Sequence, residues 1–242
     1  MSRFVLVHGG WHYGELWEPT ATELRDRGHE VHHPTVGGNR EGDDPRTGHA
    51  QACQPVADYI VQNDLRDVVL VGHSYGGSVI SKVAEVVADR LSRLVFYNAF
   101  VVADGDSVYD EFPPPLQQAV DASAAERQDG TCIVTFEAWR ESFIQDAPYD
   151  LARSTYEMLR PHPVNTLTDK LDLSRFYSLT VPKSFINCTE DMTLTQLPEW
   201  GWHPRMSHRL GLFRLVQMPG SHEVMFSDPA GLADAIERAS RR

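Results

Sequence analysis

One pentapeptide has the residue types needed for nucleophilic catalysis: Gly72-His73-Ser74-Tyr75-Gly76, which fits the pattern G-x-S-x-G. It directly follows the apolar run 68–71 and directly precedes a helical pattern over 78–90. This strand–turn–helix setting is the one in which the pattern carries a catalytic serine, and side chains in place of the glycines would collide with the neighbouring strand and helix. We therefore predict that Ser74 is a nucleophile at a helix N-terminus, where the helix dipole favours developing negative charge.

A serine hydroxyl is a poor nucleophile until a base removes its proton, and we predict His222 as that base. It lies in Pro219-Gly220-Ser221-His222, between an expected strand at 212–216 and the last helix. Loops at the carboxyl ends of strands are where open α/β sheets bind ligands. His203 and His208 fall in a stretch of mixed polarity without such a placement.

The acidic partner of His222 is expected in the loop after the preceding strand, 183–187, because the order in this type of site is serine, acid, histidine. Glu190 and Asp191 are both in that loop, and we choose Asp191. Glu190 and two acids after an earlier strand, Asp104 and Asp106, are the alternatives. A carboxylate there would hold the imidazole in one tautomer and stabilise the imidazolium as it forms.

Two backbone N–H groups are expected to bind the oxyanion of a tetrahedral intermediate. The first is that of Tyr75, the residue after the nucleophile, and the second should come from the loop after the first strand. In that loop Gly10 is the predicted donor, with Trp11 as the next choice. His8 and His73 lie beside these positions, and we interpret both as structural.

Short β-branched runs alternate with longer helical patterns along much of the chain, which is typical of βαβ units and a parallel sheet. We predict an α/β fold with a mostly parallel sheet of about six strands flanked by helices. The expected strands are 4–7, 30–33, 68–72, 94–98, 183–187 and 212–216, and the expected helices are 16–27, 48–62, 78–90 and one that begins at 227–229.

The alternation fails between about residues 103 and 180, where a triple proline precedes aromatic-rich helical stretches. We interpret 103–180 as a helical cap inserted into a core formed by 1–102 and 181–242. Aromatic side chains over the carboxyl edge of the sheet suggest a compact apolar substrate pocket. The candidates for its lining are Phe112, Phe136 and Trp139.

The bulk composition restricts the class of partner. The chain has 242 residues and a net charge of −12, which disfavours binding to nucleic acids or anionic membranes. Three widely separated cysteines fit neither a disulfide framework nor a zinc spacing, and the N-terminus reads directly into an apolar strand pattern rather than a signal peptide. We therefore expect a cytoplasmic protein, monomeric or homodimeric, that acts on a small molecule.

No cofactor or metal is expected. His8 and His12 are four residues apart, but they lie in a glycine-flanked loop without the helix and glutamate of H-E-x-x-H. The adjacent His32 and His33 would point to opposite faces of a strand. Neither G-x-G-x-x-G nor a Walker A pattern occurs in the sequence.

With these residues in place, the chain resembles the α/β-hydrolase superfamily, and within it the group of plant methyl-salicylate-type esterases and hydroxynitrile lyases. The resemblance implies Asp191 as the acid. Lyases of this group carry threonine at the position of Gly9 and lysine at the position of Glu223, so the resemblance argues against lyase activity. The esterases usually have an apolar residue where Glu223 stands, and a carboxylate near His222 should favour imidazolium. The matching segments are 4–10, 71–77, 188–191, 219–222 and 225–229.

The function expected from these observations is that of a serine hydrolase that cleaves a small, aromatic or hydrophobic carboxylic ester through an acyl-enzyme. A carbamate or amide could be hydrolysed by the same residues. Two further alternatives are a ligand-binding receptor that retains the triad and a cofactor-independent lyase or oxygenase. A dehalogenase is disfavoured because its nucleophile is an aspartate, and Ser74 takes that place.

Overall fold

In a computed structural model that describes residues 1–194 and 199–241, the core of the protein is a sheet of six strands in the order β2-β1-β3-β4-β7-β8. Every neighbouring pair is parallel. The predicted α/β fold with a mostly parallel sheet is therefore confirmed. The strands are β1 (Arg3–Val7), β2 (Glu30–His32), β3 (Val68–His73), β4 (Leu91–Tyr97), β7 (Lys183–Cys188) and β8 (Phe213–Met218).

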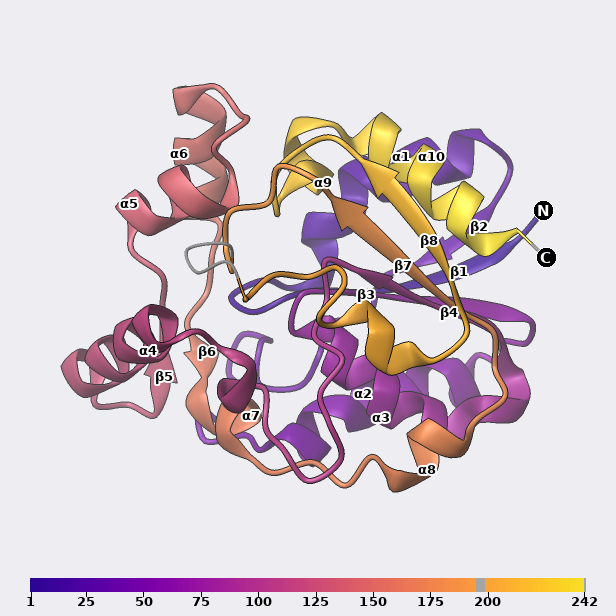
Figure 1. Ribbon diagram of the computed structural model, residues 1–242, viewed down its shortest axis with the longest axis horizontal. Coiled ribbons are helices and arrows are strands. Elements are labelled where there is room, and N and C mark those ends of the chain that lie inside the picture. The colour runs from indigo at the N-terminus through magenta and orange to yellow at the C-terminus, as the bar shows by residue number, and fades with distance from the viewer. Residues whose placement is uncertain (195–198, 242) are drawn as a thin grey trace.

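Helices cover both faces of this sheet, which explains why the strands are apolar rather than alternating (Figure 1). Along β1, Phe4 and Leu6 belong to one core cluster, whereas Val5 and Val7 belong to the other. Successive side chains of a strand point to opposite faces of the sheet, so each strand contributes apolar side chains to the core on both faces. The helices are α1 (Glu18–Asp26) and α10 (Pro229–Ser240) on one face, and α2 (His49–Gln62) and α3 (Gly76–Val87) on the other.

A long segment of short elements separates β4 from β7. Most of it lies beyond the end of the sheet toward which the arrowheads of β7 and β8 point (Figure 1). The last of its helices packs against α3, and its Phe176 also contacts Phe96 of β4, with ring centroids 6.2 Å apart. The boundary of a cap at 103–180 stays a prediction. The elements are α4 (Pro114–Arg127), β5 (Thr131–Cys132), α5 (Phe136–Ala138), a π-helical turn η4 (Trp139–Phe143), α6 (Tyr149–Glu157), β6 (His162–Pro163), α7 (Val164–Thr168) and α8 (Ser174–Ser178).

The helix α10 begins as its sequence predicts. The Asp228 side chain accepts a hydrogen bond from Gly231 N at 2.9 Å, and Pro229 occupies the first turn, where no N–H is required. The remaining short helices lie in the segments that connect the larger elements. They are η1 (Gly14–Trp17), η2 (Ala88–Arg90), η3 (Tyr109–Glu111), η5 (Ser207–Leu210) and α9 (Val224–Ser227).

Over the described residues, no helix is both long enough and apolar enough to span a membrane. Cys53, Cys132 and Cys188 are all buried, and none of them forms a disulfide.

Candidate active site

The turn between β3 and α3 holds Ser74 in an uncommon backbone conformation, with φ at +52°. A non-glycine residue in the left-handed region stores strain, which here must be held by close packing around the turn. A Cβ on Gly72 would lie 2.5 Å from Gly76 O, and one on Gly76 would lie 2.7 Å from the carbonyl oxygens of Val7 and His8. The two glycines of the motif are therefore required because backbone of the adjacent strand and helix occupies the space of a side chain.

His222 lies in the loop between β8 and α9, and Asp191 lies in the loop after β7. His222 Nδ1 and Asp191 Oδ2 are 2.6 Å apart, and both residues are buried. The other predicted acids lie elsewhere: Glu190 is exposed, and the exposed Asp104 accepts a hydrogen bond from Leu173 N through Oδ1. Of these candidates, Asp191 is the one placed against the imidazole.

Two residues that the sequence analysis did not single out hold the Asp191 carboxylate. Asn98, at the end of β4, donates from its amide nitrogen to Asp191 Oδ2, while its own Oδ1 accepts from Cys188 N at 2.8 Å. Thr193 donates to Asp191 Oδ1 from its backbone N at 2.8 Å and from its hydroxyl at 2.6 Å. Asn98 could have been found from the sequence, because it is a polar residue directly after a buried strand, at the edge of the sheet where the site lies.

The imidazole of His222 is also fixed by aromatic contacts and by its own backbone. Trp202 stacks on it with ring centroids 5.3 Å apart and planes inclined by 16°. The carbonyl oxygen of His222 accepts hydrogen bonds from Tyr97 Oη at 2.7 Å and from His73 Nε2 at 3.1 Å. His73 therefore links the strand β3 to the loop of His222.

The neighbouring His8 connects two loops inside the core. Its Nε2 accepts a hydrogen bond from Val36 N at 3.0 Å. Burial lowers the pKa of His8 to about 4, so that the ring is neutral near pH 7 and can act as this acceptor.

Ser74 and His222 both line a small cavity of about 30 Å³. Gly10, Trp11 and Tyr75 line the same cavity. Within the part of the chain that the structure describes, no hydrogen bond joins the Ser74 hydroxyl to the His222 ring. The predicted nucleophile, base and oxyanion-hole residues are thus brought to one space at the carboxyl edge of the sheet.

The first loop presents its backbone to this cavity. A Cβ on Gly10 would meet nothing within 4 Å, so the main chain there is open. Trp11 has φ at +64°, which turns the loop, and its indole Nε1 donates to Cys132 O at 3.2 Å. Tyr75 precedes the first turn of α3, where backbone N–H groups have no partner inside the helix.

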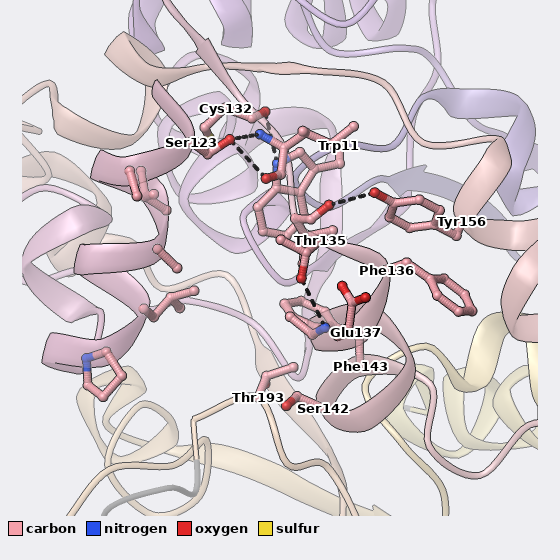
Figure 2. Close-up of a pocket in the computed structure, with 18 of the residues that line it drawn as sticks. Trp11, Ser123, Cys132, Thr135, Phe136, Glu137, Ser142, Phe143, Tyr156 and Thr193 are labelled. Atoms are coloured by element: carbon pink, nitrogen blue, oxygen red, sulfur yellow. Dashed lines mark hydrogen bonds between the residues drawn. The ribbon is translucent and has the colours of Figure 1, made fainter. Parts of the chain in front are cut away.

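A larger cavity of about 610 Å³, drawn in Figure 2, shares part of its wall with the small one. Figure 2 shows Phe136 and Phe143 on its wall, together with Trp11 and Tyr156. The residues common to both cavities are Trp11, Leu116, Phe143 and Thr193. The larger space is partly open and its wall is mostly apolar, as in sites for small organic ligands.

The three predicted pocket residues occupy different places. Phe112 lines the small cavity and Phe136 lines the larger one. Trp139 is fully buried behind them, stacked on Phe143 with centroids 5.7 Å apart, and its Nε1 donates to Ala152 O at 3.2 Å. Trp139 is therefore a core residue of the inserted segment, and it is not among the described residues that line either cavity.

The sequence left open whether Glu223 touches His222, and the structure places its carboxylate against another histidine. Its carboxylate points to His12, whose Nε2 lies 3.4 Å from Glu223 Oε2, and both side chains are buried. Burial raises the pKa of Glu223 well above its usual value and lowers the pKa of His12 well below its usual value. Glu223 is therefore in buried contact with His12.

The chain is similar to known hydrolases over most of its length. The family model described as alpha/beta hydrolase family matches residues 4–235. The solved structure of an extracellular alpha/beta-hydrolase from a Paenibacillus species is 38% identical with a TM-score of 0.96 and covers 100% of both chains. That protein is described as sharing structural and functional homology with tobacco salicylic acid binding protein 2.

Two curated relatives are hydrolases of named compounds. A carbendazim hydrolyzing esterase of a Nocardioides species is 41% identical over 125 residues, which are 50% of this chain and 52% of that protein. The chain thus aligns with about half the length of that esterase. A pyrethroid hydrolase of Sphingobium wenxiniae is 26% identical over 263 residues, 98% of this chain and 86% of that protein. Methylesterases and an alpha-hydroxynitrile lyase of Arabidopsis thaliana also match, which confirms the predicted resemblance.

Proposed function

Since the chain belongs to the alpha/beta hydrolase family, we propose that it is a serine esterase with Ser74 as nucleophile, His222 as general base and Asp191 as the acid that orients the base. The observation that carries this proposal is the buried contact of 2.6 Å between His222 Nδ1 and Asp191 Oδ2, with His222 and Ser74 on the wall of one cavity. An imidazole held in this way presents its other nitrogen to a nucleophile.

The hydrogen bonds of Asp191 favour the tautomer that a base requires. A carboxylate accepts only, so His222 Nδ1 must carry the proton and Nε2 is left with a lone pair. The donors from Asn98 and Thr193 hold the carboxylate in one orientation. The group that acts on Ser74 is therefore His222 Nε2.

In the proposed reaction, His222 Nε2 removes the proton of Ser74 as its oxygen attacks the ester carbonyl carbon. His222 then gives that proton to the leaving alcohol, and the acyl group remains on Ser74. Water, deprotonated by the same imidazole, releases the acid and restores the serine. Catalytic hydrogen bonds are often long in enzymes without substrate, so we expect the contact between Ser74 and His222 to shorten when a substrate fills the cavity.

The negative charge of the tetrahedral intermediate would be bound by backbone N–H groups. The donors that we propose are those of Tyr75 and Gly10, with Trp11 as the alternative to Gly10. Their position on the wall of the cavity that contains Ser74 supports this assignment. The open space above Gly10 leaves its main chain accessible to a bound oxygen.

The two cavities suggest how a hydrophobic ester would bind. The small cavity of about 30 Å³ is the size of a single water molecule, so it holds little more than the reacting centre. The adjoining cavity of about 610 Å³ is in the range of ligand sites and would take the aromatic or aliphatic bulk of the substrate. The names of the relatives, which hydrolyse carbendazim and pyrethroids, support a substrate with a bulky apolar part.

A substrate panel with a Ser74→Ala control tests the proposal. The panel contains methyl esters of aromatic acids, p-nitrophenyl esters and aryl carbamates. We expect ester hydrolysis that falls by about 10³–10⁶-fold in Ser74→Ala, because loss of a triad nucleophile leaves only the contribution of binding and the oxyanion hole. Stoichiometric labelling by a fluorophosphonate should occur at Ser74.

Three outcomes would contradict the proposal in different ways. Activity that survives Ser74→Ala would favour cofactor-independent chemistry. A burst of one product equivalent without turnover would favour a ligand-binding receptor. Turnover of the carbamates alone would keep the proposed triad and change the substrate class.

We also propose a cytoplasmic location, which the three free and buried cysteines support. The similar Paenibacillus protein is described as extracellular, so fractionation of the native cells into cytoplasm and medium decides between the two locations.

A further inference from the structure

Behind the candidate active site lies a cluster of three buried side chains, His12, His73 and Glu223, that the proposed reaction does not use. Each of them offers one nitrogen or oxygen as a ligand atom, and these atoms all lie within 4.8 Å of one another. The three residues are between 0% and 1% exposed. Glutamate is almost never fully buried unless a partner compensates it.

Several polar atoms of the cluster have no hydrogen-bond partner in the part of the chain that the structure describes. His73 Nε2 contacts a carbonyl oxygen, that of His222, so it must carry the ring proton and Nδ1 keeps a lone pair. Both ring nitrogens of His12, Nδ1 of His73 and Oε2 of Glu223 are buried without a hydrogen-bond partner among the described residues. Buried polar atoms almost always have partners, so this group of unpaired atoms requires an explanation such as a bound ion.

We propose that His12, His73 and Glu223 bind a divalent metal ion of the Zn²⁺ type. Two imidazoles and one carboxylate are a ligand set that Zn²⁺ uses in proteins. With bonds of about 2.0–2.1 Å, two tetrahedral ligand atoms lie about 3.4 Å apart. The observed distance from His12 Nε2 to Glu223 Oε2 is 3.4 Å. The widest pair in the cluster, at up to 4.8 Å, must close by at most about 1.4 Å.

The surroundings of the cluster suit such an ion. The contact of His73 Nε2 with a carbonyl oxygen is the outer-shell hydrogen bond that metal-bound histidines usually make. The ring of His12 packs against Trp139 and Phe226 with centroids 5.8 Å and 5.9 Å away, which gives the site an apolar wall. A Cβ on Gly9 would lie 3.0 Å from His73 Nδ1 and 3.4 Å from His12 Nδ1, so a side chain there would crowd both rings.

An ion at this place would connect three loops that carry the proposed reaction. His12 follows the loop of Gly10, His73 directly precedes Ser74, and Glu223 directly follows His222. A single ion would therefore hold together the oxyanion loop, the nucleophile and the base. We infer a positioning role for the ion, because its three ligands lie outside the lining of the small cavity. The site rests on the cluster itself and does not depend on the proposed esterase activity.

The test supplies Zn²⁺ or Co²⁺ alone during folding, because the three ligands are buried. The protein is unfolded in urea with EDTA, refolded with or without the metal, and freed of excess metal by gel filtration. We expect one equivalent of metal per chain by elemental analysis, a higher Tm with metal, and visible absorption of tetrahedral Co²⁺. A chain that refolds to the same Tm in both conditions and retains no metal would overturn the inference.

Variants distinguish this cluster from surface histidines. Glu223→Gln keeps the shape of the side chain and removes its charge. Loss of an outer-shell partner lowers metal affinity by about 10–100-fold, and loss of a direct ligand should lower it by more than that. His208→Gln and Glu190→Gln, both outside the cluster, should leave binding unchanged. Binding that persists in Glu223→Gln but disappears in His208→Gln would mean a surface site and would overturn the inference. If Glu223→Gln does not fold, X-ray absorption of wild-type protein decides, since nitrogen and oxygen ligands at about 2.0–2.2 Å without sulfur are required.

Discussion

Replacing Asp191 by asparagine is the most direct test of how the site orients its base. The carboxylate accepts four hydrogen bonds: from His222 Nδ1, from the Asn98 amide, and from the N–H and hydroxyl of Thr193. Asparagine has almost the same shape, but one half of its amide donates. The NH₂ group of the asparagine must then take the place of Oδ2, facing His222 and Asn98, or the place of Oδ1, facing Thr193. The variant therefore loses the negative charge and leaves at least one buried donor unpaired.

The size of the effect follows from the geometry. With His222 Nδ1 2.6 Å from Asp191 Oδ2, the centres of the two charged groups are about 4 Å apart, and at an effective dielectric constant of about 20 their attraction is about 4 kcal/mol. Since about 1.4 kcal/mol corresponds to a factor of ten in rate, kcat should fall about 10³-fold. A wrong imidazole tautomer would take the loss to about 10⁴-fold. The unpaired donor should lower the free energy of unfolding by about 1–3 kcal/mol.

The assay compares kcat for the best ester in wild-type protein, Asp191→Asn and Glu190→Gln, with urea unfolding of each. Glu190 is exposed and adjacent in sequence, so its variant should stay within about twofold of wild type. The reasoning is refuted if Asp191→Asn folds and retains more than a tenth of the wild-type kcat while Ser74→Ala is inactive. In that event another acid orients His222.

Three further changes test the packing and the ionisation around the site. Gly77→Ala should lower the free energy of unfolding by about 1–3 kcal/mol in urea titrations, because its Cβ would lie 2.5 Å from Phe100 O. Burial lowers the pKa of His49 to about 4, so an unfolded chain binds a proton at His49 between pH 6.5 and 4 that the folded chain does not. The folded state should therefore lose stability as pH falls through this range, by about 2 kcal/mol at pH 5, and His49→Gln should reduce the difference between pH 7 and pH 5. Trp139→Ala should cost about 3–5 kcal/mol of stability as a fully buried residue, whereas Phe136→Ala on the cavity wall should chiefly raise KM for bulky esters. Equal effects of these last two changes on stability and on KM would show that the assignment of core and cavity is wrong.

The sequence by itself determined the features that depend on short-range sterics and on periodicity. Apolar runs bounded by helical patterns predicted the six parallel strands, because a strand buried on both faces must be apolar throughout. Two glycines around Ser74 predicted the tight turn, because the backbone there leaves no space for a Cβ. The order of Ser74, Asp191 and His222 along the chain predicted which loops carry them, since parallel strands end at one edge of the sheet.

Only the tertiary structure decided which of the side chains in those loops meet. Asn98 and Trp202 approach Asp191 and His222 from other parts of the chain, and no local pattern encodes such contacts. Glu223 follows His222 directly, yet its carboxylate turns to His12, some two hundred residues earlier.

The same limit applies to the aromatic residues of the inserted segment. Phe136 and Trp139 are three residues apart, but Phe136 lines the larger cavity and Trp139 is buried behind it. Their types are alike in sequence, and only the packing of α5 and η4 against the neighbouring elements separates them. Contacts between distant segments depend on how whole elements pack, and that arrangement is a property of the folded chain rather than of any short stretch of it.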